Sequence, residues 1–375
     1  MNRRLRLTDA LPFWLSLTLP PLVVLGALLG GWTVVLAPLT AWSLFSLLDL
    51  ITPQNHENAD PETPEAALFW YRLITLIWWP VQFVLLIWLL WYVPRSGLRG
   101  WEAVGLFFGM GVVSGTIGIN YAHELLHQRP RWERALGDLL LASVLYSHFR
   151  SEHLRVHHQH VATPRDTVTA RYNEGFHRFF WRVLRTGHGS AFRAEAALLA
   201  RRGLGPWDRR NPFWLYLGLQ GGMLILALIL GGWLGLALFV WQALVAVWQL
   251  ELVNYVEHYG MTRRHLGEGK YEPVRPHHSW NADHRVTNWL LINLQRHSDH
   301  HVKPDRRFPL LQTYDPATAP QLPHGYPVMT ALAMVPPLWR RRMNPRVREW
   351  RRRHYPDVTD WAGYNAGTNP PPKGA

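Results

Sequence analysis

The chain has 375 residues, no cysteine and a formal net charge of +13 at pH 7. The absence of cysteine excludes disulfides, iron–sulfur clusters, thiolate metal sites and thiol nucleophiles, so a redox metal has to be held by His, Asp or Glu. The positive charge does not indicate a nucleic-acid-binding protein, because the arginines accompany apolar blocks and no nucleic-acid motif occurs. The 21 tryptophans are typical of a protein that contacts bilayer interfaces.

Six apolar stretches are long enough to cross the hydrocarbon as helices, which takes about 20 residues each. They cover approximately residues 11–29, 32–50, 68–93, 101–121, 213–230 and 233–255. The pairs Gly30-Gly31 and Gly231-Gly232 predict tight turns, so that neighbouring helices pair as hairpins. The sequence therefore predicts an all-α integral membrane protein with about six transmembrane helices.

The rest of the chain is expected to form no further span. The run 135–146 is too short to cross a bilayer and is interpreted as a buried or interfacial helix. The basic N-terminus precedes an apolar block without a small-residue cleavage site, which favours an anchor over a cleaved signal. We expect one membrane-embedded domain over residues 1–344, and a basic, partly disordered tail over 345–375, disordered above all at 368–375.

The distribution of charge predicts the orientation. If the N-terminus is cytoplasmic, the turns at Gly30-Gly31, 94–100 and Gly231-Gly232 face outward and contain only Arg95 and Arg99. Nearly all other basic residues then lie on the cytoplasmic side, as the positive-inside rule requires. We expect a multi-pass protein of a bacterial-type inner membrane with both termini in the cytoplasm. Segments 122–211 and 256–375, which hold almost all the histidines, then lie on the cytoplasmic face.

Histidines recur at the spacing of metal ligands. The first cluster is His123 and His127, four residues apart on one helix face in a His-Glu-x-x-His motif that also occurs in zinc proteases. Two further clusters follow, and His258 stands alone where the sixth span ends. The second cluster consists of His153, His157 and His158, and the third of His297, His300 and His301.

Nine imidazoles exceed the needs of one tetrahedral zinc and suit two metals of higher coordination. Imidazole binds zinc, copper, iron and nickel, so spacing alone does not identify the metal. A redox-active pair beside a bilayer suggests oxygen chemistry on a lipophilic substrate. A metal carrier or transporter is less favoured, because its ligands should line a path across the membrane.

The motifs resemble those of the membrane alkane monooxygenases, the alkane omega-hydroxylases of the histidine-box superfamily of membrane desaturases and hydroxylases. The resemblance extends from about the second span to Asn344, with HSWN, LPHGYPVM and PPLWRRRMNP in support. The motifs that carry it are HELLHQ at 123–128, EHLRVHH at 152–158, NYVEHYG at 254–260 and LQRHSDHH at 294–301. The rival readings are a xylene-type hydroxylase and a fatty-acyl hydroxylase or desaturase of the same superfamily.

The resemblance implies a non-haem di-iron monooxygenase that uses O2 and electrons from rubredoxin, itself reduced by a rubredoxin reductase. It implies oxidation of the terminal methyl of a linear alkane. It also implies that the iron ligands are His123, His127, His153, His157, His158, His258, His297, His300 and His301. Two residues depart from the family pattern, Val156 in place of glycine and Gln128 in place of Lys or Arg.

Several other residues are candidates for supporting roles. A metal-bound imidazole normally donates its other N–H to a carboxylate, carbonyl or water. Glu124, Glu152, Glu257 and Asp299 are candidates for such acceptors, and His278 is a candidate beside them, as is its neighbour His277; His148, His160 and His284 are not expected to be ligands.

Candidates for the substrate channel and the partner surface lie elsewhere in the chain. Ala41 and Trp42 lie about two helical turns into the bilayer, where Trp42 is a candidate floor of the channel. For an acidic electron donor, the candidate contacts are Arg129, Arg131, Arg134, Arg306 and Arg307.

Overall fold

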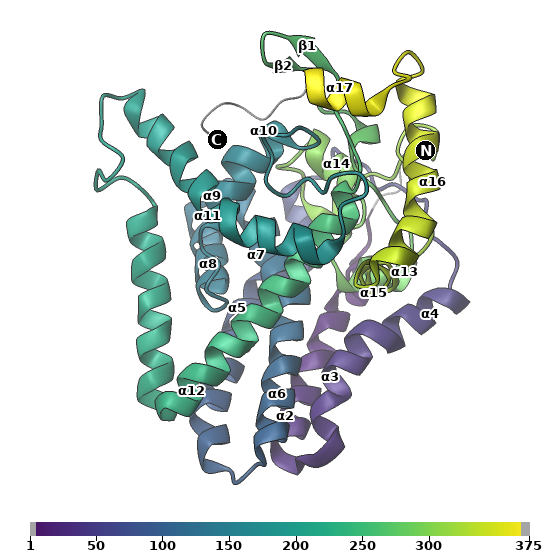
Figure 1. The fold of residues 1–375 in the computed structure, drawn as a ribbon. Coiled ribbons are helices and arrows are strands. Elements are labelled where there is room, and N and C mark those ends of the chain that lie inside the picture. The colour runs from purple at the N-terminus through teal and green to yellow at the C-terminus, as the bar shows by residue number, and fades with distance from the viewer. Residues whose placement is uncertain (1–4, 369–375) are drawn as a thin grey trace.

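The computed structural model describes residues 5–368, which are mostly helical. Long helices form a bundle, and short helices and loops cover one end of it (Figure 1). In the bundle the elements are α1 Leu7–Ala10, η1 Leu11–Thr18, α2 Leu19–Leu29, η2 Gly31–Val35, α3 Leu36–Leu39, η3 Thr40–Leu44, α4 Phe45–Ile51, η4 Glu65–Leu68, α5 Phe69–Tyr92, η5 Val93–Arg95, α6 Gly100–Val113, η6 Ser114–Ile119, α7 Asn120–Leu126 and α12 Phe213–His258.

The elements at the covered end are shorter, apart from α11 and α16. A two-stranded antiparallel hairpin of β1 His265–Gly267 and β2 Lys270–Tyr271 lies among them. The helices there are α8 Arg131–Ala142, α9 Phe149–Glu152, η7 His153–His157, α10 His158–His160, α11 Phe176–Ala200, η8 Pro276–His278, α13 Arg285–Leu290, α14 His297–Val302, η9 Phe308–Leu310, α15 Tyr326–Ala333, α16 Pro336–His354 and α17 Trp361–Thr368.

Five helical segments within the described residues are long and apolar enough to cross a membrane. The fifth, α12, is interrupted at Gly232, whose φ of 60° and ψ of −156° are not helical. There the chain reverses, so α12 runs down one side of the bundle and crosses back toward α7 (Figure 1). The expected six passes are thus present, with the fifth and sixth merged into one bent element, and the protein is a helical membrane protein.

The expected hairpin turns lie together at the end of the bundle opposite the histidines. Gly30 has almost the same backbone conformation as Gly232, with φ 62° and ψ −156°. The Glu102 carboxylate accepts hydrogen bonds from the backbone N–H groups of Gly31 at 2.7 Å and Arg99 at 2.6 Å. Arg95 donates to the carbonyl of Leu230 at 2.7 Å. These bonds satisfy backbone groups that the turns leave without helical partners.

Close packing of two helices brings the histidine-bearing ends together. A Cβ atom at Gly111 would lie 2.6 Å from the carbonyl oxygen of Gln242, and one at Gly115 would lie 2.7 Å from that of Ala246. Only glycine permits this approach between α6–η6 and α12. His123 and His258 lie at the ends of these two helical segments, so the contact positions both.

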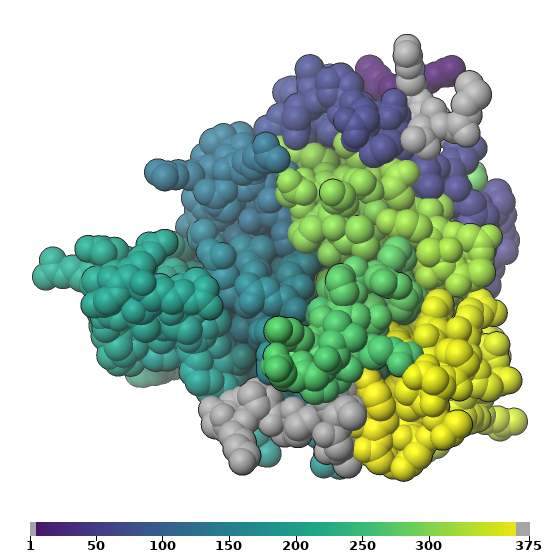
Figure 2. All heavy atoms as spheres, turned by 90° about the horizontal axis from the view of Figure 1, so that it is seen from above, coloured from purple at the N-terminus to yellow at the C-terminus, as the bar shows by residue number. Residues whose placement is uncertain are grey.

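The covering layer is tied to the bundle by a buried carboxylate. Asp49, at the end of α4, accepts hydrogen bonds from the backbone N–H of Val286 at 2.6 Å and from the Thr287 hydroxyl at 2.5 Å. These bonds cap the start of α13, which leads to the third histidine cluster. In Figure 2 the segment around residues 280–320 lies centrally on this face, with α11 to one side and α16–α17 to the other.

Two expectations outside the spans can be compared with the structure. The run 135–146 overlaps the non-spanning helix α8, as expected, with Leu140 and Leu141 buried. The boundary at residue 344 falls inside α16, whose Val347 and Trp350 are buried, so an ordered helix continues into the expected tail. The end of that tail, residues 369–375, lies outside the described residues.

Candidate metal centre

Nine histidines from four chain segments lie together at the covered end of the bundle. Within the described residues they form two groups of converging nitrogen atoms. The first group contains His123, His127, His153, His158 and His300, and the second contains His157, His258, His297 and His301. All nine predicted candidates are therefore present in the two groups.

Two of the sequence clusters, the second and the third, have members in both groups. His123 and His127 stay together, as do His297 and His301, because each pair is four residues apart on a helix. His153 and His157, also four apart, do not stay together, because η7 is a π-helix with more residues per turn. His153 instead faces the same group as His158, five residues later, so the four-residue spacing of His153 and His157 does not bring them into one group.

In the first group the Nε2 atoms approach one another closely. They lie 2.9 Å apart for His123 and His300, and 3.0 Å apart for His127 and His153. His158 lies 2.9 Å from His153 and 3.1 Å from His300, again between Nε2 atoms. The five rings thus point at one small volume.

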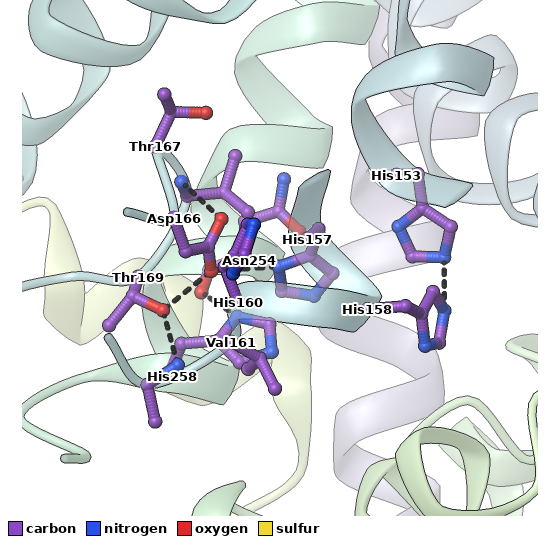
Figure 3. A network of polar contacts seen from close by, with 12 residues as sticks. His153, His157, His158, His160, Val161, Asp166, Thr167, Thr169, Asn254 and His258 are labelled. Carbon is purple, nitrogen blue, oxygen red and sulfur yellow. Dashed lines mark hydrogen bonds and ion pairs between the residues drawn. The ribbon is translucent and has the colours of Figure 1, made fainter. Parts of the chain in front are cut away.

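In the second group the Nε2 atoms also lie close together, and hydrogen bonds from Nδ1 fix the tautomers of two of its histidines. The Nε2 atoms of His297 and His258 are 3.0 Å apart, and that of His301 lies 3.0 Å from His297 and 3.2 Å from His258. His258 Nδ1 donates to the carbonyl of Asn254 at 2.9 Å. His157 Nδ1 donates to Asp166 Oδ2 at 2.9 Å, and its Nε2 has no partner among the described residues. Figure 3 shows His157, His258 and Asp166 apart from the His153–His158 pair.

These contacts fit metal ions. Because Nδ1 carries the proton in His157 and His258, each Nε2 presents a bare lone pair to its neighbours. Burial, with His157 nearby, lowers the pKa of His127 to about 3. Burial and the surrounding imidazoles hold the pKa of His153, His158, His300 and His301 well below the usual range. Neutral imidazoles with converging lone pairs are the donor set that a divalent metal requires.

A third group, Glu272, His277 and His278, does not fit a metal in the same way. His278 Nδ1 accepts the backbone N–H of Arg275 at 3.0 Å, so its proton lies on Nε2, which is 2.9 Å from the Tyr355 hydroxyl. Tyr355 also donates to Glu272. The atoms that would bind a metal are therefore already engaged in hydrogen bonds. These bonds connect the end of α16 to the loop after β2.

The predicted supporting carboxylates differ in position. Glu257 Oε1 lies 3.3 Å from His297 Nδ1, but neither atom forms a hydrogen bond within the described residues. Three others bond elsewhere: Glu124 to Gln128, Glu152 to Thr167, and Asp299 to Arg306 and Tyr314. His278 belongs to the third group described above.

Asp166 was missed by the sequence analysis. Although burial raises the pKa of this carboxyl, the His157 beside it lowers that pKa to below its ordinary value. The Asp166 carboxylate also accepts from the hydroxyl of Thr169 at 2.6 Å and the backbone N–H of Val168 at 3.1 Å. No motif marks this position, and its only signal is an acidic residue in a short loop after the second cluster.

A mostly apolar cavity lies against the histidines within the bundle. His123, His153 and His297 contribute to its wall, and so do both channel candidates, Ala41 and Trp42. Other lining residues come from η6, α12 and α15, among them Ile119, Leu250, Val253, Leu294 and Tyr326. The arrangement places imidazoles at one part of a hydrophobic space that can hold a lipophilic chain.

Comparison with known proteins places the chain in a family. A model of the fatty acid desaturase family matches residues 99–333. The chain is 41% identical over 312 residues to alkane 1-monooxygenase 2 of Pseudomonas aeruginosa, which covers 82% of each protein. It is 33% identical over 369 residues to the alkane 1-monooxygenase of Pseudomonas putida, covering 92% of this chain and 90% of the relative. The chain belongs to the alkane 1-monooxygenases of the fatty acid desaturase family.

A more distant relative is named for a different class of substrate. The chain is 27% identical over 335 residues to the xylene/toluene monooxygenase hydroxylase component of Pseudomonas putida, covering 88% of this chain and 87% of the relative. Family membership makes the protein a membrane-bound monooxygenase with a histidine-rich metal site.

The two departures from the motif pattern have structural counterparts. Gln128 donates to Glu124 at 3.0 Å. Val156 is buried, with 6% of the residue exposed, and lies on η7 between the histidines of the two groups. Neither residue displaces a candidate ligand.

Proposed function

We propose that this protein is a di-iron alkane 1-monooxygenase, which hydroxylates the terminal methyl of linear alkanes to 1-alkanols with O2. The supporting observation is the convergence of nine histidines, seven buried and two partly buried, in two groups beside an apolar cavity, in a chain 41% identical to an alkane 1-monooxygenase. In this proposal all nine histidines are ligands, five to one ion and four to the other. The electrons come from rubredoxin, which is itself reduced by a rubredoxin reductase.

Iron suits this site because it combines affinity for imidazole with redox chemistry. When bound, the iron pair supplies the two-electron reduction of O2 that puts one oxygen atom into a C–H bond and releases the other as water. Asp166 and the Asn254 carbonyl orient His157 and His258 by accepting their Nδ1–H groups. Glu257, whose Oε1 lies 3.3 Å from His297 Nδ1, is the candidate acceptor for that imidazole.

Selectivity for the terminal methyl has to come from the cavity. A terminal C–H bond is stronger than an internal one, so bond strength alone would direct attack to internal carbons. A narrow apolar channel overcomes this preference by holding the chain end beside the histidines. Its apolar wall also excludes water from the reacting methyl.

The orientation proposed for the protein follows its charge. The turns bearing Arg95 and Arg99 face outward, and the histidine end, with most of the basic residues, faces the cytoplasm. This orientation in a bacterial-type inner membrane gives a soluble electron donor direct access to the covered end.

Metal and product analysis test the proposal together. The protein from iron-replete cells should carry about two irons and, with rubredoxin and its reductase, should convert linear alkanes to 1-alkanols. His157→Ala and His300→Ala, one from each group, should each lose metal and activity. His284→Ala is the matched control, because His284 lies outside both groups. A preparation with two irons that oxidises xylene but no alkane would contradict the proposed substrate.

A further inference from the structure

The cavity beside the histidines adjoins a second, outer hollow between α4, α12 and α15. Four residues, Trp42, Gln249, Pro327 and Thr330, line both spaces, and we call them the neck residues. The outer hollow is otherwise largely apolar, with Leu47, Leu50, Leu252 and Met334 in its wall. A chain whose methyl reaches the histidines and which fills the inner cavity therefore ends at the neck.

Two polar side chains that line the inner cavity lack hydrogen-bond partners among the described residues. Gln249 is only 7% exposed, and its amide forms no hydrogen bond with any residue in the described range 5–368. Thr116, which also lines the inner cavity, has a buried hydroxyl without a partner in that same range. An unpaired amide and an unpaired hydroxyl are costly in a hydrocarbon setting, so a ligand that pairs with them gains affinity.

A purely structural role does not account for Gln249. Two other buried glutamines of the bundle are bonded between helices: Gln242 donates to the Ser143 carbonyl at 2.7 Å and Gln82 to the Ser143 hydroxyl at 2.9 Å. Gln249, two turns after Gln242 on α12, joins no such pair. A Cβ atom at Gly115 would lie 2.8 Å from Cβ of Gln249, so the close approach of η6 fixes the start of this side chain beside Thr116.

We propose that Gln249 and Thr116 form a hydrogen-bonding subsite for chains that carry a carbonyl or hydroxyl oxygen at the end remote from the oxidised methyl. The proposal rests on the proposed function and names the residues that recognise the remote end of such a chain. Gln249 precedes His258 by nine residues on α12, which is about 13 Å along the axis. The Gln249 amide N–H donates to the carbonyl oxygen of a medium-length methyl ester while its terminal methyl lies at the histidines.

Binding without turnover tests the subsite. A tritiated methyl ester and a tritiated alkane with the same number of chain atoms are equilibrated with the iron-loaded, full-length protein in nanodiscs without reductant. Empty nanodiscs correct for partition into lipid. Gln249→Met keeps the volume and removes the hydrogen bond, so the ester-to-alkane affinity ratio should fall about 3- to 10-fold. Thr116→Val should lower the ratio too, whereas Thr116→Ser, which keeps the hydroxyl, should retain it.

Each outcome decides the proposal. An unchanged ratio in both Gln249→Met and Thr116→Val overturns it, because the two groups then hold only water. Equal loss of ester and alkane binding in Gln249→Met also overturns it, because the amide is then structural. Failure of the proposed function is seen separately: the wild-type enzyme with its electron donor would hydroxylate neither chain, whatever the binding ratio.

Discussion

At the scale of single residues, the acceptor of each Nδ1–H decides which imidazole nitrogen can bind metal. His157 depends on Asp166, and His258 depends on a backbone carbonyl that its own helix provides. The first contact can therefore be changed by mutation and the second cannot. A substitution at Asp166 therefore tests directly whether the second histidine group binds metal.

We expect Asp166→Asn to weaken metal binding at the second group. An amide can present its N–H₂ to His157 Nδ1, which favours the tautomer that places the proton on Nε2, the wrong nitrogen for a ligand. Loss of such a partner typically lowers metal affinity about 10- to 100-fold. Iron retained after graded chelation, measured per protein, checks this. Glu152→Gln is the matched control, since Glu152 is buried nearby but bonds Thr167, and it should retain iron like the wild type.

A second prediction at this scale concerns Trp42. Its ring packs against Phe108 and Trp248, with centroids 5.7 and 6.1 Å away, and closes the inner cavity at the neck. Trp42→Ser should therefore admit longer alkanes, with a gain of roughly 0.8 kcal/mol for each added buried methylene. Ala41→Trp should shorten the accepted range. Chain-length profiles of product formation check both, and identical profiles for all three proteins would exclude this part of the wall from setting chain length.

The sequence predicted much of the site at the scale of single residues. What it could not predict depends on packing and on contacts made through loops. Histidine spacing together with the family motifs identified all nine histidines. It could not divide them, because whether residues 153–158 form an α- or a π-helix depends on packing and changes which histidines share a face. Asp166 was not predicted because it meets His157 through a loop. Arg307 was wrongly included among exposed docking residues, since its side chain is buried in ion pairs with Glu133 and Glu65.

At the scale of elements, two glycines make the same turn at the same end of the bundle. Gly30 and Gly232 both have positive φ with ψ near −156°, a conformation that is almost restricted to glycine. Such turns let neighbouring helices reverse without an intervening loop. The sequence predicted both from glycine pairs, although it could not tell which glycine of each pair carries the turn.

We expect Gly232→Ala to destabilise the protein, because the added Cβ strains this backbone conformation by about 1–3 kcal/mol. The matched control is Gly222→Ala on the preceding limb of α12. Gly222 is in regular helix with open space around it, so alanine there should stabilise by up to about 1 kcal/mol. Thermal unfolding of both variants in the same detergent checks the pair, and equal midpoints would show that Gly232 is not under this constraint.

At the scale of the whole molecule, exposed positive charge is separated into patches on the covered end. Arg129 and Arg131 are exposed beside the first histidine cluster, whereas Arg307 from the same candidate set is buried. A comparable exposed pair, Arg201 and Arg202, follows α11, which extends to the side of the molecule in Figure 2. The two pairs offer the same charge at different distances from the metal centre.

We expect the first pair to contact the acidic electron donor. Charge-steered association weakens with salt and with charge reversal on the docking surface. Arg129→Glu with Arg131→Glu should therefore raise the KM for rubredoxin several-fold at low salt, with a smaller effect at high salt and little change in kcat. Arg201→Glu with Arg202→Glu changes the net charge equally and is the control for a general effect of charge. If both double variants raise the KM alike, long-range attraction accounts for the association and the first pair makes no specific contact. If neither changes it, and the wild-type KM is flat from low to high salt, the donor docks elsewhere without electrostatic steering.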